Sequence, residues 1–239
     1  MSGGYERVQK WIALSGFCGR KNAEKLIEKG QVRVNGSVVS LGDHCYFNDT
    51  ITVRGEVINV PVNSYDYIVL NKPRGVITSK SDDQGRKKVL DLISSKDFKA
   101  NLFPVGRLDM NTTGLLVITN DGPFAQSFLH PSSNTSKTYS VVLDKALSNA
   151  DKVEIEKGVR LEEGKLSSCR IEKEGEKCYR VIIHEGKNRQ IRRMFFAYGY
   201  RVVKLERTHI GNLSLSKLNL KQGEYRVVSK SFLEKMIKG

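Results

Sequence analysis

The spacing of apolar positions divides the chain into two segments of different character. Over residues 1–60, apolar side chains recur at helical spacing from residue 5 to 14 and again from residue 22 to 29. Short alternating runs follow, and the pair Asn35-Gly36 between two of them is a strong hairpin signal. The first segment is therefore predicted to contain two helices and a few short strands.

From residue 65 onward, apolar runs typical of strands are interspersed with stretches of helical spacing. The run at 115–119 has no polar alternation and ends at a turn signal, which predicts a strand buried on both faces. Asp121 is placed to cap the helix that follows, and Asn188 to cap a later one. The linker between the segments is predicted at 59–64, a short uncharged stretch that contains a proline. Further strands are predicted at 67–70, 137–143 and 200–205, and helices at 89–93 and 231–237.

Charge points to the kind of partner. The chain has 239 residues, with 40 Lys and Arg against 26 Asp and Glu, and a net charge of +14. Residues 1–60 hold 8 basic and 6 acidic groups, so a net +12 lies in the remainder. An excess of this size favours a polyanionic partner, although a lysine-rich surface accounts for many basic proteins.

Composition excludes several other classes. No segment approaches the roughly 18 apolar residues of a membrane helix, and the N-terminus has no apolar signal core. We therefore expect a cytoplasmic protein without membrane contact. The four cysteines form no Cys-x-x-Cys pair and the four histidines are scattered, so no metal site is expected.

A polar loop at 106–112 carries the most distinctive chemistry. It holds one carboxylate, Asp109, with Arg107 two residues away and no second acid until Asp121. A lone carboxylate beside a cation stays ionised, which suits a nucleophile or a base and does not suit a two-carboxylate glycosidase site. Because the loop enters a buried strand, its side chains can be held in one geometry. On spacing alone, an aspartate that makes a turn or caps a helix is the commoner explanation.

Two basic clusters accompany this loop. Arg189, Arg192 and Arg193 share a face near the start of a predicted helix, where guanidinium groups can bind phosphate. In the first segment, Arg20, Lys21, Lys25 and Lys29 form a basic stripe that Glu24 and Glu28 interrupt. A solvated helix face is the alternative for both clusters.

These motifs resemble those of the ribosomal RNA pseudouridine synthases of the RsuA/RluB type. The stretch from Gly106 to Gly122 matches the family's Gly-Arg-Leu-Asp motif and its Thr-Asn-Asp-Gly end at every defined position. Four further family motifs follow the same order: Lys72-Pro73-Arg74-Gly75, Lys137-Thr138-Tyr139, the basic helix after Glu185, and Lys204-Leu205-Glu206-Arg207. The first 60 residues resemble the RNA-binding module first seen in ribosomal protein S-four.

The resemblance implies roles for individual residues. Asp109 would be the catalytic residue, either as nucleophile or as the base that takes a sugar proton, and Arg192 would pair with it. Tyr139 would stack on the target base, with Leu205 as the opposite wall. The remaining basic residues would bind RNA: Arg107, Lys72, Arg189 and Arg193 around the site, and Arg20, Lys21 and Lys25 in the N-terminal module.

Pattern and resemblance together predict an α+β protein. A small helix-rich RNA-binding domain would span 1–60, and a catalytic domain at 65–239 would have a mixed, mainly antiparallel sheet flanked by helices. The predicted function is isomerisation of a specific uridine in ribosomal RNA to pseudouridine, by a monomer without cofactor or metal, and the motif variety favours the large subunit. The alternatives are a non-enzymatic ribosome-assembly factor and an RNA glycosylase that releases free uracil.

Overall fold

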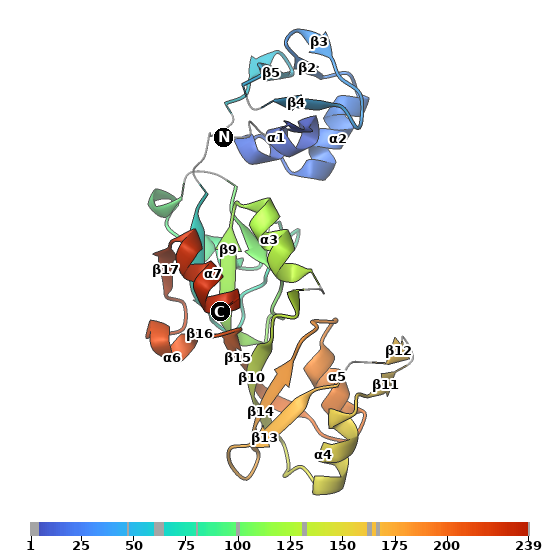
Figure 1. Ribbon diagram of the computed structural model, residues 1–239, viewed down its shortest axis with the longest axis vertical. Coiled ribbons are helices and arrows are strands. Elements are labelled where there is room, and N and C mark those ends of the chain that lie inside the picture. Colours follow the sequence, from blue (N-terminus) through green and yellow to red (C-terminus); the bar gives the residue numbers. More distant parts are fainter. Residues whose placement is uncertain are drawn as a thin grey trace. The chain divides into compact units, whose positions relative to one another are not determined.

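The computed structural model describes residues 5–46, 48–59, 65–79, 81–98, 101–130, 133–161, 164–165 and 168–238. The chain forms two compact units, one of Met1–Tyr65 with Phe98–Leu102 and one of Asp66–Asp97 with Phe103–Gly239. Each unit is described by itself (Figure 1). Most of the predicted linker lies outside the described residues, and independent folding of 1–60 and 65–239 stays a prediction.

The first unit packs two helices against short antiparallel strands. Helices α1 (Val8–Ser15) and α2 (Arg20–Glu28) supply buried Ile12 and Ala23 to a core that strands close with Val32 and Val53. The predicted hairpin at Asn35-Gly36 is confirmed, with φ of 50° and 85° at the two residues. The strands are β1 (Tyr5–Arg7) paired with β4 (His44–Tyr46), and β2 (Val32–Val34), β3 (Ser37–Val38), β5 (Ile51–Val53) and β6 (Glu56–Val57) in the order β3-β2-β5-β6.

The second unit is built on a mixed sheet, and the predicted fold class is confirmed. Among the described residues this sheet has nine strands in the order β13-β14-β10-β15-β9-β7-β17, with β16 on β15 and β8 on β9. Neighbouring described strands are antiparallel except β15 and β9, which run parallel at Glu206–Thr113 and Arg207–Gly114. The bounds are β7 (Tyr67–Lys72), β8 (Phe103–Val105), β9 (Thr113–Thr119), β10 (Lys137–Leu143), β13 (Arg170–Lys173), β14 (Cys178–Ile183), β15 (Val202–Ile210), β16 (Leu213–Ser214) and β17 (Tyr225–Val228).

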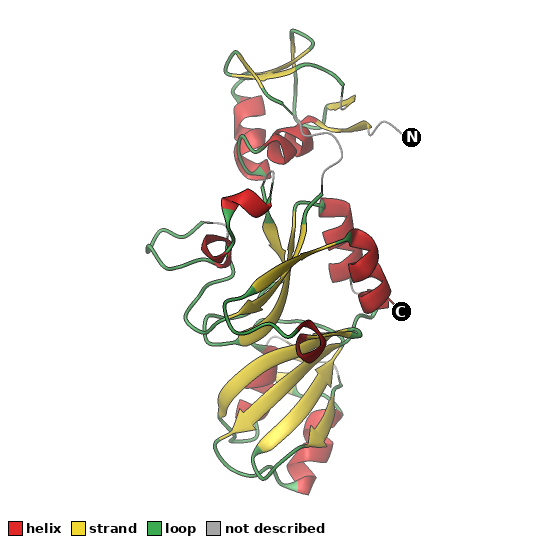
Figure 2. Cartoon of the chain, turned by 90° about the vertical axis from the view of Figure 1, so that its left-hand side faces the viewer, coloured by secondary structure: helices red, strands yellow, loops and turns green. Residues whose placement is uncertain are grey.

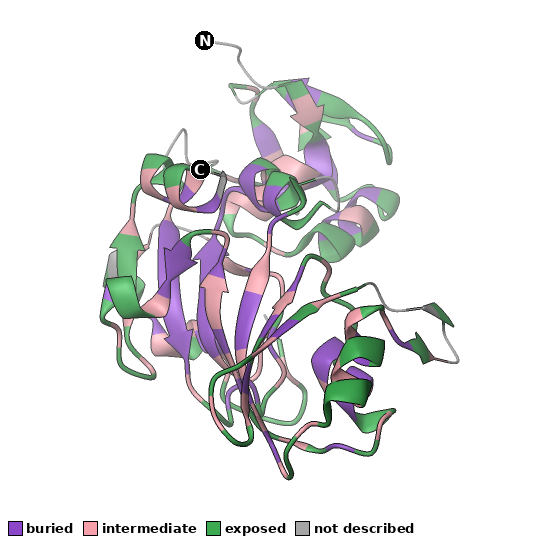
Figure 3. Cartoon of the chain, turned by 60° about the horizontal axis from the view of Figure 1, so that its bottom comes forward, coloured by how far each residue is buried: buried purple, intermediate pink, exposed green. Residues whose placement is uncertain are grey.

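Helices cover this sheet and complete its core. Helices lie beside the strands of this unit (Figure 2). α3 (Gly122–Leu129) and α7 (Lys230–Lys238) contribute Phe124 and Leu233 to a cluster with the buried residues of β7 and β9. Asp121 caps α3 as predicted, because its side chain accepts a hydrogen bond from the Phe124 nitrogen at 3.0 Å. The central strands are buried along most of their length (Figure 3). The other elements are 3-10 turns η1 (Val89–Leu92) and η2 (Ser95–Asp97), helices α4 (Asn149–Glu156), α5 (Gln190–Phe196) and α6 (Leu215–Leu218), and the pair β11 (Arg160–Leu161) and β12 (Gly164–Lys165).

Several predicted boundaries are wrong. Tyr5–Arg7 is a strand because it pairs with β4, and long-range pairing overrides the helical spacing of its side chains. Helix α5 begins at Gln190 and not after a cap at Asn188, since Arg189 adopts the left-handed conformation (φ 46°, ψ 31°).

Candidate active site

The loop that carries Asp109 joins β8 to β9 and is fastened at several points. The Thr112 nitrogen donates to the Asp109 carbonyl at 2.9 Å, which closes a tight turn. The Gly75 nitrogen donates to the Met110 carbonyl at 2.9 Å, and the Thr78 hydroxyl to the Leu108 carbonyl at 2.8 Å. The Asp109 side chain, 31% exposed, is thus presented from a backbone that is held on both sides.

Lys72 lies beneath this loop and not on the surface. It is fully buried, and its Nζ donates to the carbonyls of Pro73 at 3.0 Å, Met110 at 3.4 Å and Thr112 at 2.9 Å. Burial lowers its pKa to about 8, against an opposing effect of Asp109. The prediction that Lys72 binds phosphate is wrong, because the strand β7 directs its ammonium group into the protein.

The arginine that pairs with Asp109 is also different from the predicted one. Arg189 Nη1 lies 3.9 Å from Asp109 Oδ2, and no ion pair between Arg192 and Asp109 occurs among the described residues. Arg192 instead donates to the carbonyls of Val202 at 2.8 Å and Asn111 at 3.1 Å. The pKa of Arg192 is lowered chiefly by burial and then by Arg189, while Asp109 acts in the opposite direction. Arg192 therefore ties α5 to β15 and to the Asp109 loop through backbone carbonyls.

Asp109 opens onto a cavity of about 380 Å³. Its walls include Tyr139 on β10 and Leu205 on β15, both largely buried. Arg107 and Arg189 line the cavity as well and are exposed to solvent. Of the predicted site residues, five line this cavity, namely Asp109, Tyr139, Leu205, Arg107 and Arg189, whereas Lys72, Arg192 and Arg193 do not. The catalytic and binding roles of the five stay predictions.

Chemically, the cavity offers a carboxylate beside an aromatic ring and an apolar wall. A flat planar group that has left its own stacking partners could lie between Tyr139 and Leu205, within reach of Asp109. Within the part of the chain that the structure describes, no cluster of three His, Cys, Asp or Glu side chains could hold a metal ion. The same described residues contain no helix long and apolar enough to cross a membrane.

Comparison with known proteins identifies the fold. A family model for RNA pseudouridylate synthase matches residues 66–197, and an S4 domain model matches residues 6–51. The ribosomal large subunit pseudouridine synthase B of Bacillus subtilis (strain 168) is 42% identical over 222 residues, covering 90% of this chain and 89% of the relative. The chain belongs to the RNA pseudouridine synthase family.

Other members of the family are similar to this chain over most of its length. The dual-specificity RNA pseudouridine synthase RluF of Escherichia coli (strain K12) is 35% identical over 222 residues, covering 92% of this chain and 74% of the relative. A crystal structure of a pseudouridylate synthase, 30% identical, covers 97% of this chain and 100% of that one with a TM-score of 0.70. The predicted pseudouridine synthase family, the S4 module and the enzyme class are confirmed, and the comparisons give no support to a non-enzymatic assembly factor.

Two cavity residues of this synthase were missed by the sequence analysis. Lys137 and Arg207 line the same cavity as Asp109. Burial lowers the pKa of Lys137, and the charge of nearby Arg207 acts in the same direction. Both residues belong to family motifs that the sequence shows, and strand alternation puts Lys137 on the same face as Tyr139. That alternation is the signal that could have found Lys137.

The predicted RNA-binding residues of the S4 module lie on one helix. Arg20, Lys21 and Lys25 are exposed in the first turns of α2, whose opposite side buries Ala23, Leu26 and Ile27. Helix α2 begins at Arg20, earlier than predicted, so these cations project from a regular helix surface. Their role in RNA binding stays a prediction.

Proposed function

We propose that this protein converts a uridine of ribosomal RNA, in the large subunit, to pseudouridine at the Asp109 cavity. The observation that carries the proposal is the position of Asp109 at the mouth of a cavity walled by Tyr139 and Leu205. The names of the relatives support the substrate, since the Bacillus subtilis protein is a large-subunit enzyme. The net charge of +12 outside residues 1–60 supports a polyanionic substrate at this unit.

The reaction transfers the bond between the ribose and the uracil from N1 of the base to C5. Asp109 either attacks C1′ of the ribose or takes the proton from C2′. In both cases the bond from C1′ to N1 breaks, and its electron pair stays on the uracil. The base turns and C5 bonds to C1′. This bond displaces Asp109 if Asp109 attacked C1′, and in the other case the proton returns from Asp109 to C2′. The proton on C5 then leaves, and N1 takes up a proton. Atoms and charge balance without a cofactor.

Each cavity residue has a separate role in this proposal. Tyr139 replaces the stacking that the target base loses when it leaves the RNA, and Leu205 closes the other face so that the loose base can turn without escaping. Arg189 favours the ionised form of Asp109 by its charge, at 3.9 Å. Arg107, Arg189 and Arg193 bind phosphates of the surrounding RNA, and Arg20, Lys21 and Lys25 bind a second part of it.

The protein is further proposed to act as a monomer in the cytoplasm. The observation behind the monomer is that Asp109 and its cavity walls come from one chain, so the site needs no second copy. The proposed substrate, ribosomal RNA, supports the location. Light scattering of the protein, free and with an RNA fragment, measures the oligomeric state, and a dimer in both samples would contradict the proposal.

Product analysis tests the function. Purified protein is incubated with transcripts of both ribosomal RNAs, and the digested nucleosides and the free bases are separated and weighed by mass spectrometry. Pseudouridine in the large-subunit RNA with no free uracil is expected. Free uracil would indicate a glycosylase. If neither pseudouridine nor free uracil forms, the result would favour a non-enzymatic assembly factor. Mapping pseudouridine in ribosomal RNA from cells with and without the gene then identifies the position.

A further inference from the structure

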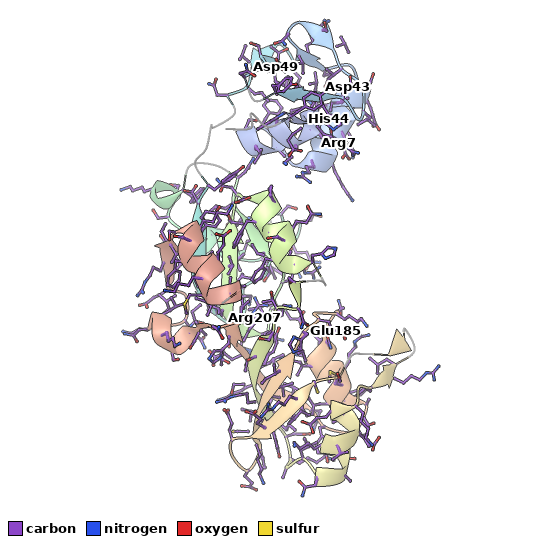
Figure 4. All side chains as sticks on the ribbon, in the orientation of Figure 1. Arg7, Asp43, His44, Asp49, Glu185 and Arg207 are labelled. Carbon is purple, nitrogen blue, oxygen red and sulfur yellow. The ribbon has the colours of Figure 1, made fainter. Side chains whose placement is uncertain are left out.

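Two cations form the floor of the active-site cavity. Arg207, labelled in Figure 4, comes from β15 in the middle of the sheet and is only 3% exposed. Its Nε donates to the Leu115 carbonyl at 2.7 Å, and its Nη2 is buried with no hydrogen-bond partner among the described residues. Lys137 is half-buried, and its Nζ lies 3.4 Å from the Thr135 carbonyl. Neither cation forms an ion pair within the described part of the chain. We call Lys137 and Arg207 the cationic floor.

The sheet places the cationic floor around Tyr139. Lys137 and Tyr139 are two residues apart on β10 and so point to the same face. Arg207 lies opposite Tyr139 in the pairing of β10 with β15. A bulge between Thr138 and Tyr139 shifts this register, and without it Thr208 would take the position of Arg207. The irregularity thus brings a second cation beside the ring.

This arrangement is unfavourable for the empty protein. A buried cation loses hydration that an ion pair or good hydrogen bonds must replace, and two neighbouring cations repel each other. Fastening β15 to β9 through the Leu115 carbonyl explains the Nε of Arg207, but it explains neither its unpaired Nη2 nor the presence of Lys137. The floor is therefore arranged for a negative charge that arrives in the cavity.

The position favours the target base over a phosphate as the source of that charge. Arg107, Lys187 and Arg189 line the cavity and are exposed, where phosphates of bound RNA can keep part of their hydration. The cationic floor lies beneath these residues, next to the ring on which the base is proposed to stack. A neutral uridine brings no charge there, but a detached uracil does.

We propose that Lys137 and Arg207 are catalytic residues that stabilise the uracil anion while it is separated from the ribose. The proposal rests on the function proposed above. When the bond from C1′ to N1 breaks, its electron pair is shared by N1, O2 and O4 of the uracil. The two cations donate hydrogen bonds to these atoms and keep their own protons. Their interaction strengthens as the charge develops, which lowers the barrier and leaves substrate binding little changed.

Single substitutions of each cation test the proposal. Lys137→Gln and Arg207→Gln are compared with the parent protein and with Arg180→Gln, a control on β14 whose arginine is exposed and paired with Glu172 and Glu174. The control loses the same charge from the same sheet. Rates are measured in a single turnover at saturating RNA, and the dissociation constant is measured separately. Each RNA carries either uridine or 5-fluorouridine at the target position.

The fluorinated base isolates the charge on the leaving group. Fluorine withdraws electrons and stabilises the detached base, so it replaces part of the help that the cations give. Since fluorine cannot leave C5 as the proton does, conversion is followed as loss of 5-fluorouridine from the digested RNA. We expect each floor variant to react about 10²-fold more slowly on uridine, the usual effect of removing one such donor, with affinity within threefold. The deficit should be at least fivefold smaller on 5-fluorouridine, and Arg180→Gln should match the parent.

Three results would overturn the proposal. Unchanged rates would show that the cations do not act in the reaction, weaker RNA binding at an unchanged rate would assign them to a phosphate, and equal losses on both bases would make them structural. Lys137→Gln decides the matter if Arg207→Gln fails to fold, because Lys137 does not make the bond to Leu115. A parent protein that forms no pseudouridine would count against the proposed function and not against the floor specifically.

Discussion

Among single residues, Lys72 shows the largest difference between the predicted and the observed position of a side chain. A lysine in a polar turn after a strand has the features of a phosphate ligand, yet its ammonium group donates hydrogen bonds to backbone carbonyls of the loop that carries Asp109. The fully buried lysine thus anchors the backbone of the loop that carries Asp109. The same is true of Arg192, whose guanidinium bonds the Asn111 and Val202 carbonyls.

Lys72→Met should lower the free energy of unfolding by about 1–3 kcal/mol, because buried carbonyls lose their donor. The pKa of Lys72 is about 8 in the folded protein against an ordinary 10.5. Between these values the unfolded chain binds more protons, so ionisation of Lys72 makes the free energy of unfolding rise with pH. The difference between parent and variant should therefore widen from pH 8 to 10 in urea titrations.

Lys173→Met, at an exposed position of the same sheet, is the control and should show neither effect. A constant difference between parent and Lys72→Met across this pH range would mean that the lysine is not charged and buried as the structure has it.

Asp109→Asn should abolish activity and leave folding and RNA affinity nearly intact, because the amide keeps the shape of the side chain and removes only its charge. Single-turnover rates on the target RNA, together with thermal melting, provide the measurement. Residual turnover within tenfold of the parent, a loss of less than about 1.4 kcal/mol in the barrier, would argue against Asp109 as the essential group.

Substitutions of Arg189 and Arg192 should affect different properties, RNA affinity for Arg189 and the reaction rate for Arg192. Arg189→Met removes the ion pair with Asp109, in which the arginine side chain is 54% exposed. Such exposed pairs contribute only about 0.2–1 kcal/mol. The reaction rate of this variant should therefore fall less than tenfold, while its RNA affinity weakens. Arg192→Met frees the Asn111 carbonyl within the loop that carries Asp109, and a shift of about 1 Å there can cost about 10²-fold in rate. Single-turnover rates at saturating RNA compare the two. The reverse order of losses would show that the charge of Arg189 on Asp109 matters more than the anchoring of its loop.

At the scale of elements, the parallel pairing of β9 with β15 positions the residues of the Asp109 cavity. Asp109 precedes β9, while Leu205 and Arg207 belong to β15, so the distance between these strands sets the width of the cavity. Gly114 permits that distance. A Cβ there would lie 2.7 Å from the backbone nitrogen of Arg207 and closer still to its oxygen, and its φ of 107° disfavours any other residue.

Gly114→Ala should therefore destabilise the second unit by about 3 kcal/mol, the sum expected of overpacking and backbone strain. It should also reduce activity, because β15 must move away from β9. Gly175→Ala, in the turn between β13 and β14, is the control, since its Cβ would meet only the Cys178 side chain at ordinary contact distance. Chemical denaturation of both variants measures the effect, and equal stability of the two would contradict this account of the strand contact.

At the scale of the whole molecule, the chain divides into two units, each with its own core. The second unit has its own core, with Val117 of β9 packed among residues of α3 and α7. Deletion of residues 1–65 should therefore leave a folded catalytic unit with weaker affinity for large ribosomal RNA fragments. Circular dichroism and binding assays measure the two effects, and an unfolded product would contradict the division into two domains.

A substitution in the full chain complements the deletion. Replacing Arg20, Lys21 and Lys25 with alanine together should weaken RNA binding and its salt dependence without changing the melting temperature, because these side chains are exposed on α2. An unchanged affinity would place the RNA-binding surface of the first unit elsewhere.

The sequence by itself determined the class of fold, the family and most elements. Local features encode these directly: the unbroken apolar run of β9, the cap at Asp121 and the turn at Asn35-Gly36 all depend on neighbours along the chain. The cavity residues Asp109 and Tyr139 were found because they lie in long motifs.

Only the tertiary structure decided which polar groups are buried and what they contact. Tyr5–Arg7 became a strand through β4, and Lys72 became an internal donor because β7 is covered on both faces. Arg189, left-handed just before α5, lies beside Asp109 in place of Arg192, and a bulge in β15 at Thr208 puts Arg207 opposite Tyr139. Such outcomes depend on the register and proximity of segments far apart in the chain, about which the spacing of residues within each segment carries no information.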